Sequence, residues 1–204
     1  RNFCARAGGR RRRSLALPAP RAARTMMDRM STEFLTGKND KFITIIGTGG
    51  TIDKDYPRSQ MGYAFEIDEP AAQRVLEGLP HSGMEFEVVS VCKKDSTEIT
   101  ADDRNQLADA VRRAKGSRVV VTHGTDTMIE SAKFVLAKGA ADGKTVAFTG
   151  AMKPERFKDS DAHFNLGMAV AATSLQKPGT VVVCMGGRAI DCSKASRTAD
   201  GFFV

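Results

Sequence analysis

Apolar, β-branched runs alternate with helix-like segments along most of the chain. Runs such as KFITIIG are typical of strands that are covered on both faces of a sheet. The segments between them follow helical spacing, and one begins with Thr100 three residues before Asp103, a pattern that resembles a capping box. The expected strands are 41–47, 85–92, 117–124, 144–150 and 180–187, and the expected helices are 69–79, 100–115, 126–139 and 160–175.

This alternation predicts the fold class. Strands and helices in βαβαβ order with short connections indicate an α/β fold, a three-layer α/β/α domain with a mostly parallel, Rossmann-like sheet. Ligands of such sheets bind beyond the carboxyl ends of the strands, near the point where the strand order reverses. We expect this domain over residues 39–204, preceded by a disordered basic tail over residues 1–38.

The positive charge lies almost entirely in that tail. The chain of 204 residues has a formal net charge of +7, yet residues 1–30 hold nine arginines and one acid, Asp28. The remainder contains 22 basic and 23 acidic residues, so we expect no nucleic-acid partner for the folded part. The Arg-rich tail is typical of an organellar transit peptide, or it precedes a true start at Met26, Met27 or Met30; both interpretations stay open.

Cysteine usage and hydropathy narrow the choice of cellular compartment. The four cysteines form neither a CxxC pair nor a metal-ligand spacing. No apolar run approaches the ~20 residues of a membrane span, so no membrane contact is expected. These features favour a reducing compartment, the cytoplasm, with a mitochondrion or plastid as the alternative if the tail is a transit peptide.

The loop after the first strand, GTGGTI at residues 47–52, invites four interpretations. A dinucleotide fingerprint needs a third glycine where Ile52 stands, and a phosphate loop needs a Gly-Lys-Ser/Thr that does not follow. Two interpretations remain. The glycines form a simple tight turn, or Gly49 and Gly50 let the backbone pass close to a substrate to which Thr51 presents its hydroxyl.

The loops after the next two strands favour the second interpretation. Ser96 follows the second strand, and Thr125 and Asp126 follow the third. Because the carboxyl ends of parallel strands share one edge, we expect these side chains to meet Thr51 in one crevice. Taken singly, Asp126 is equally well explained as a helix N-cap and the threonines by β-propensity.

Three motifs together closely resemble the bacterial-type L-asparaginase family, in particular its short, single-domain members. They are TGGTIDK, THGTDTMIESA and TGAMKPERFKDSDAHFNLGMAVAA, and the resemblance covers about residues 42–202. It implies hydrolysis of the side-chain amide of L-asparagine, or a related small amide, to aspartate and ammonia. It also implies an acyl-enzyme intermediate, no metal or cofactor, and a homo-oligomer.

The resemblance assigns catalytic roles by position. Thr51 matches the nucleophilic threonine, and Tyr63 matches a tyrosine that contacts it from a loop closing over the site. Thr125 matches a second catalytic threonine that works with Asp126 and a lysine. Gapless alignment puts Arg197 at that lysine's position, but Lys194 would share a face with Arg197 if this segment were helical, so either residue is a candidate.

It also assigns substrate binding. Ser96 matches a residue that binds the α-carboxylate of the substrate, and Asp126 one that binds its α-ammonium group. The backbone around Gly50 and Gly124 could supply N–H groups to an oxyanion. Two alternatives remain: a weak or inactive homologue that binds a small acidic amino acid or amide without turnover, and, with less support, a dinucleotide enzyme.

Overall fold

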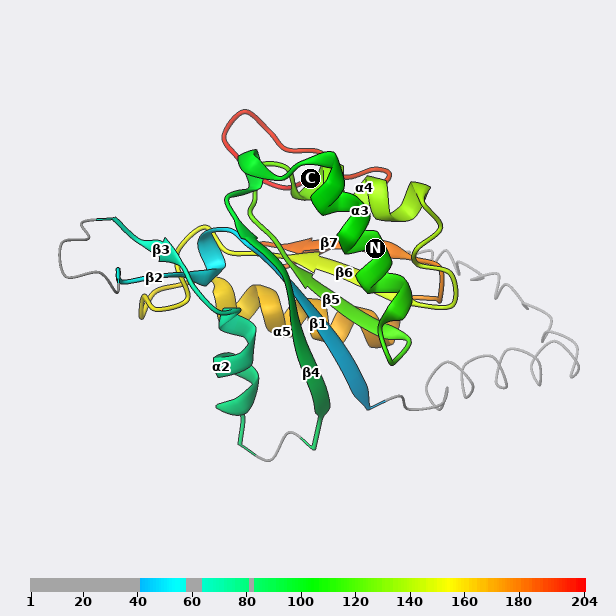
Figure 1. Ribbon diagram of the computed structural model, residues 1–204, viewed down its shortest axis with the longest axis horizontal. Helices are drawn as coiled ribbons and strands as arrows, with labels where there is room; N and C mark the ends of the chain where they lie inside the picture. Colours follow the sequence, from blue (N-terminus) through cyan, green and yellow to red (C-terminus); the bar gives the residue numbers. More distant parts are fainter. Residues whose placement is uncertain (1–40, 58–63, 81–82) are drawn as a thin grey trace, which may run out of the picture. The chain divides into compact units, whose positions relative to one another are not determined.

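The computed structural model describes residues 41–57, 64–80 and 83–204 (Figure 1). The expected tail over residues 1–38 and the candidate Tyr63 lie outside these ranges. The larger elements are β1 (Phe42–Gly49), α2 (Ala71–Glu77), β4 (Glu85–Lys94), α3 (Ala101–Arg113), β5 (Arg118–Thr122), α4 (Met128–Ala137), β6 (Thr145–Thr149), α5 (Ala162–Leu175), β7 (Val181–Met185) and β8 (Arg188–Asp191). The short elements are the 3₁₀ turns η1 (Thr51–Asp53) and η2 (Ser96–Glu98) and the strands β2 (Lys54–Asp55) and β3 (Glu66–Ile67).

The main sheet has the strand order β4-β1-β5-β6-β7-β8. All neighbours pair in parallel except β7 and β8, which pair antiparallel. The chain passes from β1 out to β4 and then returns to β5 on the other side of β1. The strand order therefore reverses at β1, and the loops after β1 and β5 flank the crevice where α/β sheets bind ligands.

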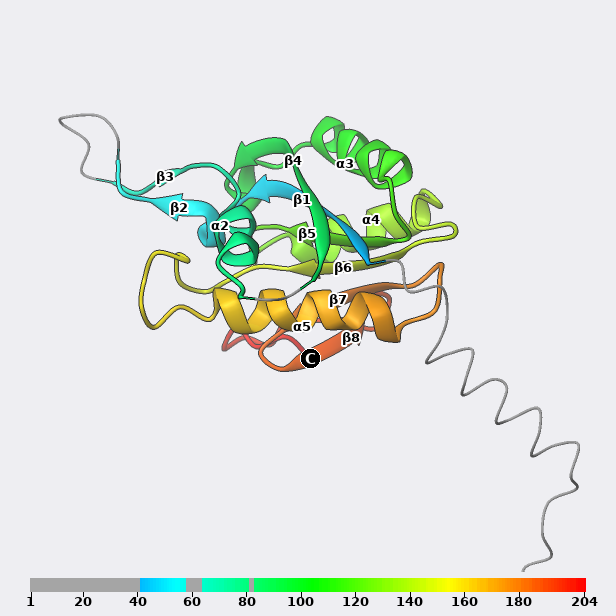
Figure 2. The ribbon, with the colours of Figure 1, turned by 90° about the horizontal axis from the view of Figure 1, so that it is seen from below.

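Helices cover both faces of this sheet (Figure 2). Alternate strand residues point to opposite faces: Ile46 packs in the cluster that contains α3 and α4 residues, whereas Ile45 packs with α2 and α5 residues. The central strands are almost fully buried, which explains their near-continuous apolar runs. The predicted three-layer α/β fold with a mostly parallel sheet is confirmed.

Each predicted strand and helix overlaps an observed one, although β1 and β4 each extend two residues further than predicted, and the capping box is confirmed. Thr100 Oγ1 accepts a hydrogen bond from the Asp103 N–H at 3.2 Å, and the Asp103 carboxylate accepts one from the Thr100 N–H at 2.8 Å. Sequence patterns did not predict β8 or the β2–β3 pair. Both are short and largely solvent-facing, so they carry little apolar period.

Candidate functional site

The loop after β1 is packed against the loop after β5, backbone to backbone. Gly50 has φ +89°, and a Cβ built on it would lie 2.4 Å from both the Cα and N atoms of Gly124. Only glycine fits such a contact, since a methyl group there would overlap main-chain atoms. The next residue in each loop is a threonine, Thr51 or Thr125, so the two threonines follow a pair of touching glycines.

The loop after β4 packs into the same place. A Cβ on Gly124 would lie 2.7 Å from the Ser96 Cβ. The Ser96 hydroxyl, in a residue only 2% exposed, accepts a hydrogen bond from the Asp126 N–H at 3.2 Å. The Thr127 hydroxyl donates to the Ser96 carbonyl at 2.6 Å. Ser96 is thereby fixed while its own hydroxyl proton stays available to a further acceptor.

Asp126 does not cap the helix that follows it. Thr127 is the N-cap residue of α4, and no side chain bonds there. The Asp126 carboxylate instead pairs with Arg197, whose Nη1 lies 2.6 Å from Oδ1. Arg197 also donates from Nε to the Gly201 carbonyl at 3.2 Å, and its backbone forms a bridge with Phe203. The C-terminal segment therefore holds this guanidinium at the carboxylate.

Lys194 lies in a turn rather than a helix, and it is exposed. The condition under which it would share a face with Arg197 is therefore not met. Its backbone N–H donates to the Asp191 carbonyl at 3.0 Å, within a turn that directly follows β8. Of the two candidates for the lysine position, Arg197 is the one that contacts Asp126.

Asp53, at the end of the Thr51 turn, is a buried carboxyl group that sequence patterns did not single out. It is 1% exposed, and its Oδ1 accepts a hydrogen bond from the Ala71 N–H at 2.7 Å. Among the described residues, no partner reaches its Oδ2. Burial raises the pKa of this carboxyl from 3.8 to about 7, against the opposing effect of the Ala71 hydrogen bond. Asp53 followed a glycine turn in the sequence and resembled an ordinary loop residue.

His123, one residue before Gly124, is fully buried. Its Nδ1 lies 2.8 Å from the Gly124 carbonyl, which can only accept, so this nitrogen carries the proton. Burial lowers the pKa of His123 to about 4. The imidazole is thus neutral at physiological pH, and its buried Nε2 has no hydrogen-bond partner among the described residues.

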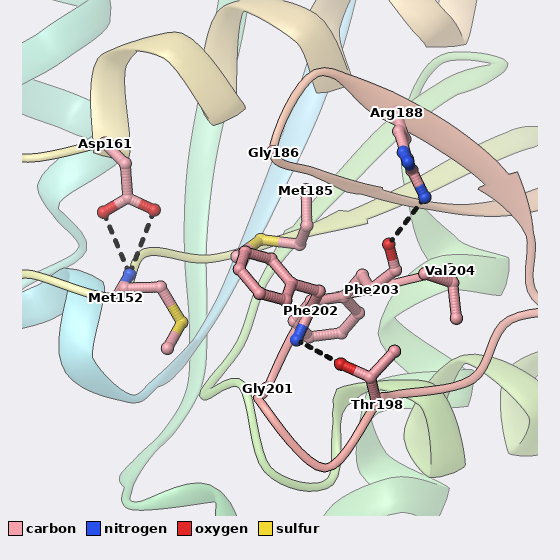
Figure 3. A pocket seen from close by; sticks show the side chains of 10 residues that line it. All are labelled: Met152, Asp161, Met185, Gly186, Arg188, Thr198, Gly201, Phe202, Phe203 and Val204. Carbon is pink, nitrogen blue, oxygen red and sulfur yellow. Dashed lines mark hydrogen bonds between the residues drawn. The ribbon is translucent and has the colours of Figure 1, made fainter.

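A separate pocket of about 490 Å³ lies beside the turn between β7 and β8 (Figure 3). Its walls are mostly apolar: Met152, Met185, Phe202, Phe203 and Val204 line it, with Asp161, Arg188 and Thr198 as polar neighbours. The Asp161 carboxylate already accepts hydrogen bonds from the Met152 and Lys153 N–H groups. None of the candidate catalytic or substrate-binding residues lines this pocket.

Within the described ranges, no cluster of three or more His, Cys, Asp or Glu residues is arranged to hold a metal ion. Nor is any helix there long and apolar enough to cross a bilayer. The polar groups of the three loops include hydroxyls, backbone N–H groups, the buried Asp53 carboxyl, the His123 imidazole and the Asp126–Arg197 pair. Such a set can bind a small zwitterion and activate a hydroxyl.

Comparison with known proteins adds an independent line of observation. The family model "Asparaginase, N-terminal" matches residues 42–201. The chain is 30% identical over 169 residues to a probable periplasmic L-asparaginase of Haemophilus influenzae, covering 77% of this chain and 47% of that protein. It is 28% identical over 165 residues to L-asparaginase 2 of Escherichia coli, covering 76% and 46% respectively.

The fold has a solved counterpart too. The thermostable L-asparaginase from Thermococcus kodakarensis superposes with a TM-score of 0.66 at 23% identity, covering 80% of this chain and 50% of that one. The chain thus spans about half of the length of these proteins. The family model nevertheless matches most of it, across all three loops that meet at the carboxyl edge of the sheet. The chain belongs to the asparaginase family.

Proposed function

We propose that this chain is an amidohydrolase that cleaves the side-chain amide of L-asparagine, or a related small amide, with Thr51 as the nucleophile. The observation that carries the proposal is the backbone contact between Gly50 and Gly124. It joins the loop of Thr51 to the loop of Thr125 and Asp126 at the point where the strand order reverses. Family membership supports the reaction class.

The chemistry balances without a cofactor. The Thr51 hydroxyl attacks the amide carbon, and its proton passes by way of the Thr125 hydroxyl to the Asp126 carboxylate. The same proton is then delivered to the amide nitrogen, and the C–N bond breaks to release ammonia and leave an ester on Thr51. Water then hydrolyses the ester and releases the carboxylic acid. Backbone N–H groups near Gly50 and Gly124 are available to stabilise the oxyanion of each tetrahedral intermediate.

Substrate binding in this proposal uses the residues that surround Gly124. The Ser96 hydroxyl proton can be donated to an α-carboxylate, and the outer oxygen of Asp126 can accept from an α-ammonium group. Asp126 keeps Oδ2 for this purpose, since Arg197 contacts Oδ1 and the aspartate side chain remains 55% exposed. Tyr63 stays a candidate contact of Thr51 from the sequence alone.

Arg197 differs in one respect from a lysine at the same position. A guanidinium does not give up its proton in a protein, so Arg197 can orient Asp126 and stabilise negative charge but cannot act as a base. We therefore assign the pairing of Asp126 to Arg197 and leave Lys194 outside the site. A homo-oligomer and a cytoplasmic location remain part of this proposal.

An ammonia-release assay on asparagine, glutamine and other small amides tests the function. Thr51→Ala and Thr125→Ala should each abolish release. Thr97→Ala is the matched control, because Thr97 is an exposed threonine next to Ser96. The Thr97 hydroxyl donates to the Asp95 carboxylate at 3.1 Å. Full activity in both loop variants would refute the nucleophile. Calorimetric binding of aspartate by a wild-type chain that releases no ammonia would instead establish the binding-protein alternative.

A further inference from the structure

Asp53 joins three parts of the chain near the proposed nucleophile. Its N–H donates to the Gly50 carbonyl at 3.1 Å, which closes the turn that contains Thr51. Its carbonyl accepts from the Asp68 N–H at 3.0 Å, next to the β2–β3 pair. Its carboxylate accepts from the Ala71 N–H at 2.7 Å, at the first residue of α2. One residue thus connects the Thr51 turn to β3 and to α2.

The other contacts of this turn are apolar packing and a main-chain hydrogen bond. The Ile52 side chain packs with Ala71, Ala151 and Ala162, and the Ile52 carbonyl accepts from the Glu155 N–H at 3.2 Å. Apolar contact is non-directional, whereas a hydrogen bond of 2.7 Å restricts angle as well as distance. The Asp53 carboxylate is the side chain of the turn that makes such a bond.

The carboxylate is kept in an unfavourable place. It is almost fully buried, and one of its oxygens has no partner among the described residues. Three charged groups act on it: Arg74 of α2, Lys93 of β4 and Asp68. The two cations are paired elsewhere, Arg74 with Glu155 at 2.8 Å and Lys93 with Glu69 at 2.6 Å. Burial of a carboxyl without a cation paired to it lowers the stability of the fold. A functional role would account for its hydrogen bond with Ala71.

We propose that Asp53 is a positioning residue for the proposed reaction: its carboxylate anchors the Thr51 turn to α2 and so fixes where the Thr51 hydroxyl lies. This inference rests on the proposed function. The residue acts through Thr51 and is not itself required to touch substrate. A nucleophile that swings out of line by about 1 Å loses as much as ~100-fold in rate, which sets the scale of the expected effect.

Three variants separate positioning from general stability. Asp53→Ala removes the acceptor, whereas Asp53→Asn keeps a carbonyl oxygen that can accept from Ala71. Val135→Ala, in a fully buried residue of α4, is the control for loss of stability without loss of this bond. We expect Asp53→Ala to lower kcat by about 10- to 100-fold with little change in KM. Asp53→Asn and Val135→Ala should both stay within about threefold of wild type in kcat.

Amide hydrogen exchange supplies a readout that does not depend on activity. Exchange at the Ala71 amide should accelerate in Asp53→Ala and not in Asp53→Asn or Val135→Ala. Should Asp53→Ala fail to fold, Asp53→Ser, whose hydroxyl is one bond shorter, takes its place.

Two results would overturn the inference: unchanged Ala71 exchange in Asp53→Ala, or faster exchange with wild-type kcat. A wild-type chain that cleaves no amide would refute the proposed function and, with it, the positioning of a nucleophile. The exchange data would show separately whether the anchor exists, so the two failures are distinguishable.

Discussion

Replacing Asp53 with asparagine should remove a pH dependence from the stability of the domain. The folded state raises the pKa of this carboxyl to about 7 from 3.8. At a pH below 3.8, the pKa of the unfolded state, the carboxyl is protonated in both states. Between pH 3.8 and about 7 it is protonated only in the folded state. Stability therefore falls as pH rises from about 4 to about 7 and is flat above that. Asparagine does not titrate, and its side-chain oxygen can still accept from the Ala71 N–H.

The magnitude follows from the same pKa values. From pH 5 to about pH 7 the folded state holds a proton that the unfolded state has lost. Over these roughly two pH units, the free energy of unfolding of the wild type falls by about 1.4 kcal/mol per unit, or about 3 kcal/mol in all. Urea unfolding of wild type and Asp53→Asn at both pH values measures this as a difference of differences, in which all other titrating groups cancel. The variant should gain about 3 kcal/mol relative to wild type on going from pH 5 to pH 8. A constant difference between the two proteins across this range would refute the burial argument.

Three further predictions concern the neighbouring contacts. Gly50→Ala should cost about 3 kcal/mol or more in urea unfolding because its Cβ would lie 2.4 Å from backbone, whereas Gly143→Ala, at φ +71° with nothing within 4 Å, should cost only about 1–2 kcal/mol; equal losses would contradict the contact. Arg197→Lys should raise kcat in the ammonia assay, since a lysine paired with Asp126 can exchange a proton, and an unchanged or lower kcat would show that arginine is not limiting. The hydrogen bond from the Lys94 ammonium lowers the pKa of Asp103 to about 2. Asp103→Asn should therefore lose about 1–2 kcal/mol at pH 7, and the loss should shrink as pH falls from about 4 to 2; a loss independent of pH would rule out this ion pair as its source.

The main sheet was predictable because its strands are buried on both faces. Val119, Val120 and Val121 must each face a packed helix layer or the sheet interior, so the sequence shows a continuous apolar run. The β8 strand, by contrast, is exposed along most of its length and owes its place to pairing with β7. Local composition carries no record of such a contact, so the pattern of apolar residues does not predict β8.

Sequence motifs predicted which loops would lie next to one another at the candidate site, and the residue roles remain predictions. Gly50 and Gly124 gave a recognisable signal because close backbone approach admits only glycine. The pairing of Asp126 with Arg197 joins residues 71 positions apart, and Arg197 lies in a non-helical segment. No local pattern around either residue predicts this pairing. Asp53 was missed for another reason: only the packing of Ala71 and Ile52 around it turns an ordinary loop aspartate into a buried acid.

The contact between Gly50 and Gly124 also limits how such a site can change over generations. A side chain at Gly50 would have to displace the main chain of Gly124, and a side chain at Gly124 would have to displace Ser96. Single substitutions at these glycines should therefore be strongly disfavoured, because the atoms that a new Cβ would meet belong to the neighbouring loops. Differences in catalysis between proteins with this loop arrangement are expected to arise instead at side-chain positions such as Arg197, because such a residue can be replaced without moving a loop.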